Sequence, residues 1–152
     1  MRLALYQPDI PQNLGAFIRL AACLATPLDI IEPCGFPVDD RRIRRAAMDY
    51  VDLARIRRHD SWETFRRDRQ PGRLVLLTTA SATRLTGARF EPDDILLLGR
   101  ESAGVPPEIH QSAELKVRVP MQQGARSLNV ALAAAMVLSE ALRQTDGYQT
   151  LA

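Results

Sequence analysis

Short apolar runs alternate with amphipathic stretches along this chain. Residues 3–6 and 28–31 predict two strands, and the strongly apolar runs at 74–78 and 95–98 are typical of strands buried on both faces of a sheet. Weaker runs at 53–56 and 117–119 predict two more strands. Strands buried on both faces need helices on each side, so the pattern predicts an α/β fold with a parallel sheet covered on both faces.

The amphipathic stretches predict the helices of this fold. Gln12 or Asn13 can cap a helix whose apolar positions recur at helical spacing, namely Leu14, Phe17, Ile18, Ala21 and Leu24. We expect a short helix over 41–48, another over 61–69 with Ser61 as its cap, and a long one from Ser127 to about residue 144. Without a linker or repeat between them, these elements predict one domain over residues 1–152.

Composition narrows the class of protein. The 152 residues are 46% hydrophobic, which is enough for a folded core. The N-terminus meets proline and polar residues too early for a signal peptide, and no apolar run approaches the roughly 20 residues of a membrane span. We therefore expect a cytoplasmic protein. Cys23 and Cys34 form no CxxC motif, and His59 and His110 stand apart, so we expect reduced thiols and no metal site.

The charge pattern gives a weaker indication of a nucleic-acid partner. Net charge is only +2, but 19 of the 20 basic residues are arginine, whose planar fork suits phosphate. A genome biased towards arginine codons explains that count equally well. Acids are mixed among the arginines of 41–69, which also fits a solvated face. Arg41, Arg42, Arg44 and Arg45 have no acid between the members of each pair, and with Arg126 they are our candidates for RNA contacts.

Three segments with unusual residues follow predicted strands, where open α/β sheets bind ligands. They span 13–19, 98–106 and 119–130. Singly each has a plain explanation: Asn13 and Ser127 could be helix caps, and Gly99 and Gly104 could serve turns. The sequence contains no GxGxxG, GxxxxGK[ST] or GxSxG motif, so dinucleotide binding of the Rossmann type, nucleotide hydrolysis and a nucleophile elbow are not indicated.

Together the three segments resemble the signature motifs of the SpoU branch of the SPOUT methyltransferase superfamily. The matches are N-x-G-x-x-x-R at 13–19, G-x-E-x-x-G at 99–104 and S-L-N-V at 127–130, in the family's order. YQPDIPQN near the start, IIEPCGF at 30–36 and RRAAMDY at 44–50 look like the TrmL type, which methylates the ribose of the tRNA wobble nucleotide. Arg100 and the pair Gln122–Gln123 depart from the usual residues and leave substrate preference open.

The resemblance implies a fold and a cofactor that the hydrophobic pattern does not show. The fold is a parallel sheet whose C-terminal segment is threaded through a loop as a trefoil knot. The cofactor is S-adenosylmethionine (AdoMet), which leaves as S-adenosylhomocysteine. By position, the residues implied to contact it are Leu77, Gly99, Val119, Ser127 and Leu128.

The resemblance also implies how the reaction proceeds on RNA. Arg19 is expected at the reacting 2′-hydroxyl, either as base or as the group that fixes a phosphate and stabilises the alkoxide; physical chemistry favours the second because arginine stays charged. An ion pair with Glu101 is the structural alternative. We expect Asn13, Glu101, Ser127 and Asn129 to hydrogen-bond together and shape the loops around Arg19 and the cofactor.

The expected assembly is a homodimer that binds tRNA, with the helices at 14–24 and 128–142 as candidates for the interface. Ordinary core packing is a strong alternative for both helices. Three further functions stay open: methylation of another tRNA or ribosomal RNA nucleotide, AdoMet or RNA binding without catalysis, and small-molecule binding of the flavodoxin type.

Overall fold

The computed structural model describes residues 1–39, 41, 43, 45, 50, 53–69 and 71–151. These residues form a parallel sheet of six strands in the order β3-β2-β1-β5-β4-β6. The strands are β1 (Arg2–Tyr6), β2 (Leu28–Ile31), β3 (Ile56–His59), β4 (Leu74–Leu77), β5 (Ile95–Leu98) and β6 (Leu115–Val117). The predicted α/β fold with a parallel sheet is confirmed.

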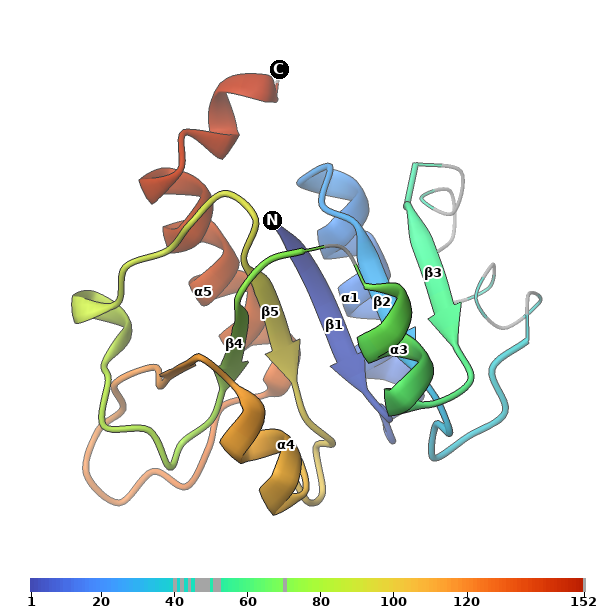
Figure 1. Cartoon of the computed structure of the whole chain (residues 1–152), viewed down its shortest axis with the longest axis horizontal. Helices are drawn as coiled ribbons and strands as arrows, with labels where there is room; N and C mark the ends of the chain where they lie inside the picture. Colours follow the sequence, from blue (N-terminus) through green and yellow to red (C-terminus); the bar gives the residue numbers. More distant parts are fainter. Residues whose placement is uncertain are drawn as a thin grey trace.

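Helices cover both faces of the sheet (Figure 1). Successive side chains of a strand point to opposite faces, and the buried strand β5 divides accordingly: Leu96 and Leu98 belong to one apolar cluster, Ile95 and Leu97 to the other. The first cluster includes residues of α1 (Pro11–Cys23) and α5 (Val130–Gln144). The second includes residues of α3 (Trp62–Asp68) and α4 (Pro107–Ser112). The core therefore lies on both sides of one sheet.

Several predicted boundaries are wrong. The first helix begins at Pro11 with Ile10 as N-cap, so neither Gln12 nor Asn13 caps it. The last helix begins at Val130 after Asn129, three residues beyond Ser127. The third strand lies at 56–59 instead of 53–56, and the sixth at 115–117 instead of 117–119. Helix α4 was not predicted.

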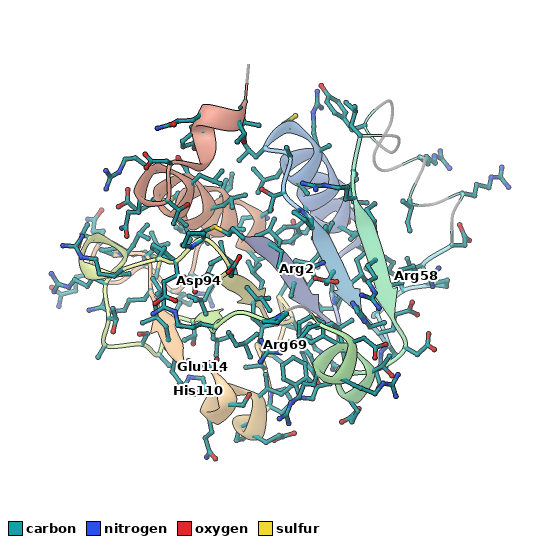
Figure 2. All side chains as sticks on the ribbon, turned by 45° about the horizontal axis from the view of Figure 1, so that its top comes forward. Arg2, Arg58, Arg69, Asp94, His110 and Glu114 are labelled. Atoms are coloured by element: carbon teal, nitrogen blue, oxygen red, sulfur yellow. The ribbon has the colours of Figure 1, made fainter. Side chains whose placement is uncertain are left out.

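Other predictions hold. Ser61 caps α3, and its hydroxyl accepts the Thr64 amide at 3.1 Å. At the sheet edge, Arg58 of β3 binds the Glu32 carboxylate at 2.7 Å, so part of the arginine-rich segment is a solvated, paired surface (Figure 2). The helix predicted over 41–48, with Arg42 and Arg44, falls largely outside the described residues. Within the described part of the chain, no helix is long and apolar enough to cross a membrane.

The strand order reverses between β1 and β5, and this reversal defines where a ligand can bind. Chain connections from neighbouring strands leave in opposite directions at such a point, which opens a crevice at the carboxyl ends. The three loops after β1, β5 and β6 emerge at this edge of the sheet, the lower edge in Figure 1. The loop after β1 leads into the motif at 13–19, the loop after β5 contains the motif at 99–104, and the loop after β6 contains most of the motif at 127–130.

Candidate functional site: a cofactor pocket at the strand ends

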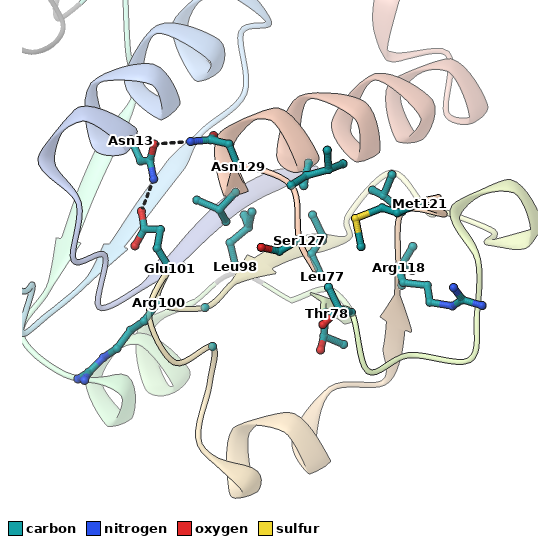
Figure 3. A pocket seen from close by; sticks show the side chains of 18 of the residues that line it. Asn13, Leu77, Thr78, Leu98, Arg100, Glu101, Arg118, Met121, Ser127 and Asn129 are labelled. Carbon is teal, nitrogen blue, oxygen red and sulfur yellow. Dashed lines mark hydrogen bonds between the residues drawn. The ribbon is translucent and has the colours of Figure 1, made fainter. Parts of the chain in front are cut away.

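A cavity of about 440 Å³ lies at the carboxyl ends of β4, β5 and β6 (Figure 3). This volume falls in the range of about 300–1,000 Å³ typical of small-molecule pockets. The structure brings together in its lining all five residues expected at the cofactor: Leu77, Gly99, Val119, Ser127 and Leu128. Leu77 and Leu128, 51 positions apart in the sequence, thus belong to one site.

The pocket has apolar walls and a closely packed glycine turn. Leu98 and Val117 add apolar surface to Leu77, Val119 and Leu128. An added Cβ at Gly99 would lie 2.4 Å from the Gly104 carbonyl carbon, so only glycine fits there. Two backbone hydrogen bonds between residues 100 and 104, of 2.8 and 2.9 Å, close this turn. Apolar walls beside accessible backbone suit the adenine ring and ribose of AdoMet, so the residues fit the implied cofactor.

A hydrogen-bonded chain of side chains joins three elements at one end of the pocket (Figure 3). The Asn129 amide nitrogen donates to Asn13 Oδ1, and Asn13 Nδ2 donates to Glu101 Oε1, each at 2.9 Å. The Asn129 Oδ1 atom also accepts the Ala131 amide at 2.9 Å and so caps α5. Three of the four residues expected to bond together do so. Ser127 lines the same pocket, but among the described residues its side chain makes no hydrogen bond to the other three.

Asp9 completes the chain and was missed by the sequence analysis. The Asp9 amide donates to Glu101 Oε2 at 3.1 Å, and the Glu101 amide donates to Asp9 Oδ1 at 3.0 Å. The other Asp9 oxygen accepts both the amide and the hydroxyl of Ser102. The loop after β1 is thus fastened to the loop after β5. The only signal in the sequence was an isolated acid close behind a predicted strand.

The pKa values of the Asp9 and Glu101 carboxyl groups are shifted in opposite directions. Burial raises the pKa of Glu101 above its usual value, and its hydrogen bond to Asp9 raises it further. The hydrogen bond to Glu101 lowers the pKa of Asp9 to about 2. Proton loss is therefore easier from Asp9 than from Glu101.

The structure places Arg19 away from the pocket of its own chain. Its guanidinium lies 4.8 Å from the centre of the Tyr50 ring and donates to the Tyr50 hydroxyl at 3.5 Å. Arg19 lines a different cavity, on the other side of α1. Arg19 is thus absent from the lining of the pocket that the motif loops form in its own chain, and Glu101 has Asn13 and Asp9 as partners in place of an ion pair with Arg19.

Of the arginines expected at RNA, one lines the second cavity. Arg41, Arg45 and Arg126 are exposed. Arg45 lines the same cavity as Arg19, and Arg126 directly precedes the pocket residue Ser127. Arg42 and Arg44 lie outside the described residues.

Thiol and metal chemistry find little support in the described part of the chain. Cys23 and Cys34 are free, and burial raises the pKa of the Cys34 thiol to about 11, which keeps it protonated and unreactive. Residues 1–39, 53–69 and 71–151 contain no group of three or more side chains placed to hold a metal ion.

The fold and site define an α/β protein with a small-molecule pocket at the reversal point of a parallel sheet. The sequence model of the SpoU rRNA Methylase family matches residues 1–139, so this chain belongs to that family. A tRNA (cytidine(34)-2'-O)-methyltransferase from Beijerinckia indica is 58% identical over 144 residues, covering 93% of this chain and 90% of its own length.

Solved structures agree with the family assignment. The structure described as "Structural insights into the 2-OH methylation of C/U34 on tRNA" is 38% identical, with a TM-score of 0.87 and 94% coverage of both chains. An AdoMet-bound rRNA methyltransferase from Sinorhizobium meliloti is 29% identical with a TM-score of 0.82, and covers 93% of this chain and 55% of its own. The parallel sheet is shared with both; the trefoil knot in this chain stays a prediction.

Proposed function

We propose that this protein transfers a methyl group from AdoMet to the ribose 2′-hydroxyl of the wobble nucleotide of tRNA, a cytidine or uridine, in the cytoplasm. The observation that carries the proposal is the pocket in which all three family motifs meet, in a chain 58% identical to a tRNA (cytidine(34)-2'-O)-methyltransferase. The near-complete coverage of that relative and of the C/U34 structure supports the same substrate.

The pocket residues would hold the cofactor and order the loops around it. Leu77, Val119 and Leu128 would contact its apolar parts, and Gly99 would let backbone groups approach. AdoMet supplies a methyl group on a sulfonium, an intrinsically good leaving group, so the protein needs neither a nucleophile nor a metal. The task of the chain Asp9–Glu101–Asn13–Asn129 is to hold the surrounding loops in one arrangement, because such transfer depends on collinear alignment.

Arg19 would act on the RNA. A ribose hydroxyl must lose its proton during transfer, and a fixed guanidinium beside it stabilises the developing negative charge or fixes the adjacent phosphate. The Tyr50 ring and hydroxyl orient Arg19, which lowers the cost of placing the guanidinium at one position. This role fits an always-charged group better than that of a base.

The proposed active form is a homodimer. Leu132 and Met136 lie one turn apart on α5 and are 61% and 48% exposed, and Leu128 just before the helix is 40% exposed, so the start of α5 presents an apolar stripe. Because Arg19 lies outside the lining of its own pocket, a second copy packed against α1 and α5 offers a way to bring Arg19 to the cofactor pocket of its partner. The dimer thus supplies a group that the isolated pocket lacks.

Transfer of a labelled methyl group from AdoMet tests the proposal. Purified protein is incubated with tRNA lacking the modification, and the product is digested and mapped to a nucleotide. We expect one 2′-O-methylated nucleoside at position 34. Label at another tRNA or ribosomal RNA position would replace the substrate assignment, while cofactor or RNA binding without label would leave a binding module. A bound flavin on purification would contradict the AdoMet pocket.

A further inference from the structure

A second cavity of about 780 Å³ lies along α1 and shares no lining residue with the cofactor pocket. We call it the α1 groove; Leu14, Gly15 and Arg19 of the helix line it on one side, and Phe36, Ile43 and Arg45 on the other. We propose that the α1 groove binds the base and phosphate of an RNA nucleotide that flanks the methylated one.

The lining of the groove combines an apolar floor with two cations. Leu14 and Ile43 are buried, and the half-buried Phe36 also lines the groove, so its lining is largely apolar and includes one aromatic residue. Arg19 and Arg45 are exposed guanidinium groups in the same lining. The described lining residues include no carboxylate. An aromatic residue beside two cations fits a nucleobase and its phosphate.

A protein surface is a poorer match for the same groove. The proposed dimer uses Arg19 at the end of the groove; a second copy that covered the whole groove would also take the Arg45 guanidinium out of water, and the described lining offers no acid to neutralise the two charges. Such unpaired buried charges are costly. Phosphate neutralises them directly and accepts the paired hydrogen bonds that arginine donates. Charge complementarity therefore favours RNA over a protein partner at this groove.

Single-stranded RNA is the form that this groove accommodates. Bases in loops are unstacked and can turn outward onto an aromatic side chain, whereas bases within a duplex cannot. The inference rests on the proposed function, since the wobble nucleotide lies in the anticodon loop and its neighbours are free to enter a pocket. If Arg19 reaches the partner's cofactor pocket, a groove beside Arg19 is suitably placed for the next nucleotide of the same strand.

Binding of an anticodon stem-loop RNA across a salt series tests the proposal. Fluorescence anisotropy is measured with S-adenosylhomocysteine present for wild type, Arg45→Ala and Phe36→Leu, with Arg66→Ala on α3, over the opposite sheet face, as matched control. Loss of one phosphate contact lowers the slope of log affinity against log salt by about 0.7 for single-stranded RNA, which we expect for Arg45→Ala alone. Loss of base stacking weakens binding at least about fivefold with an unchanged slope, which we expect for Phe36→Leu.

Further measurements separate the possible failures. Affinity for S-adenosylhomocysteine should be unchanged in both groove variants, and a thermal melt confirms that Phe36→Leu remains folded. If both variants bind RNA as Arg66→Ala does while wild type methylates tRNA, the groove proposal is wrong and the proposed function stands. Variants that become monomers, with RNA binding lost only through that change, would identify the groove as a subunit interface. Wild type that methylates no RNA yet shows both groove effects would overturn the proposed function alone.

Discussion

Glu101 receives hydrogen bonds from two directions, and this sets what the position tolerates. Asn13 Nδ2 donates to one oxygen and the Asp9 amide donates to the other. A carboxylate can accept both, whereas a glutamine side chain offers one acceptor and one donor. Whichever way a glutamine faces, its NH2 group meets another donor. The residue identity therefore follows from the direction of the hydrogen bonds, independently of any charge requirement.

Replacing Glu101 with glutamine should weaken cofactor binding. We expect Glu101→Gln to bind S-adenosylhomocysteine about tenfold less tightly or worse, since an unsatisfied donor next to the pocket costs about 1–3 kcal/mol. Calorimetric titration measures the effect, with Glu108→Gln on the exposed side of α4 as control. Equal affinity of Glu101→Gln and wild type would show that the chain of side chains does not order the pocket.

Asp9 should stabilise the fold in a pH-dependent way. Its pKa in the folded protein is lowered from 3.8 to about 2, so its contribution is present above pH 3.8 and is lost as pH falls through 2. Asp9→Asn should therefore unfold at lower urea concentration than wild type at neutral pH. The difference should shrink progressively between pH 4 and pH 2. A difference that is constant over this range would assign the effect to packing and not to the Asp9 charge.

At the scale of elements, the sequence predicts best where burial is complete. The four inner strands β1, β2, β4 and β5 were placed to within one residue because most of their residues are apolar and buried. The edge strand β3 carries Arg57 and Arg58 on its exposed positions, so its run of apolar residues ends where the strand begins. Helix α4 has six residues, of which only Ile109 is buried, so its sequence shows no apolar repeat from which a helix could be predicted.

The candidate site also has a part that the sequence predicts and a part that it does not. The motif residues gather at one pocket because parallel strands end at one edge, which sequence order alone can predict. Six residues of helix turn Arg19 about 240° from Asn13, so the two cannot face the same pocket of one chain, and the sequence motif alone does not show this separation. Asp9 was missed because its role depends on the spatial meeting of two loops ninety-two positions apart.

The start of α5 can be tested with two adjacent polar residues. Asn129 accepts the Ala131 and Leu132 amides, so Asn129→Ala should lower the free energy of unfolding by about 0.5–2 kcal/mol. Ser127, predicted as a cap by sequence alone, is exposed and lies before the helix. Ser127→Ala should therefore leave stability nearly unchanged. Chemical denaturation of both variants decides between the two caps, and equal losses would contradict the structure.

At the scale of the whole molecule, the apolar stripe on α5 should control assembly. Leu132 is 61% exposed in the centre of the stripe, where a buried charge would be costly. We expect Leu132→Asp to convert a dimer to a monomer with little loss of thermal stability, as measured by light scattering and a melt. Arg143→Ala on the same helix, whose side chain pairs locally with Glu140, is the matched control. A wild-type monomer at micromolar concentration would contradict the proposed assembly.

The separation of Arg19 from its own cofactor pocket makes a stronger prediction about the dimer. Arg19→Ala should bind the cofactor but transfer no methyl group, and Gly99→Ala should lose the cofactor because its Cβ meets the Gly104 backbone. Coexpressed in equal amounts, the two inactive variants should regain about a quarter of wild-type activity: half of the dimers are mixed, and each mixed dimer has one complete site of two. The regained activity should disappear when Leu132→Asp is added to both chains. If Arg19 served its own pocket, no mixed dimer would contain a complete site, and the mixture would stay inactive.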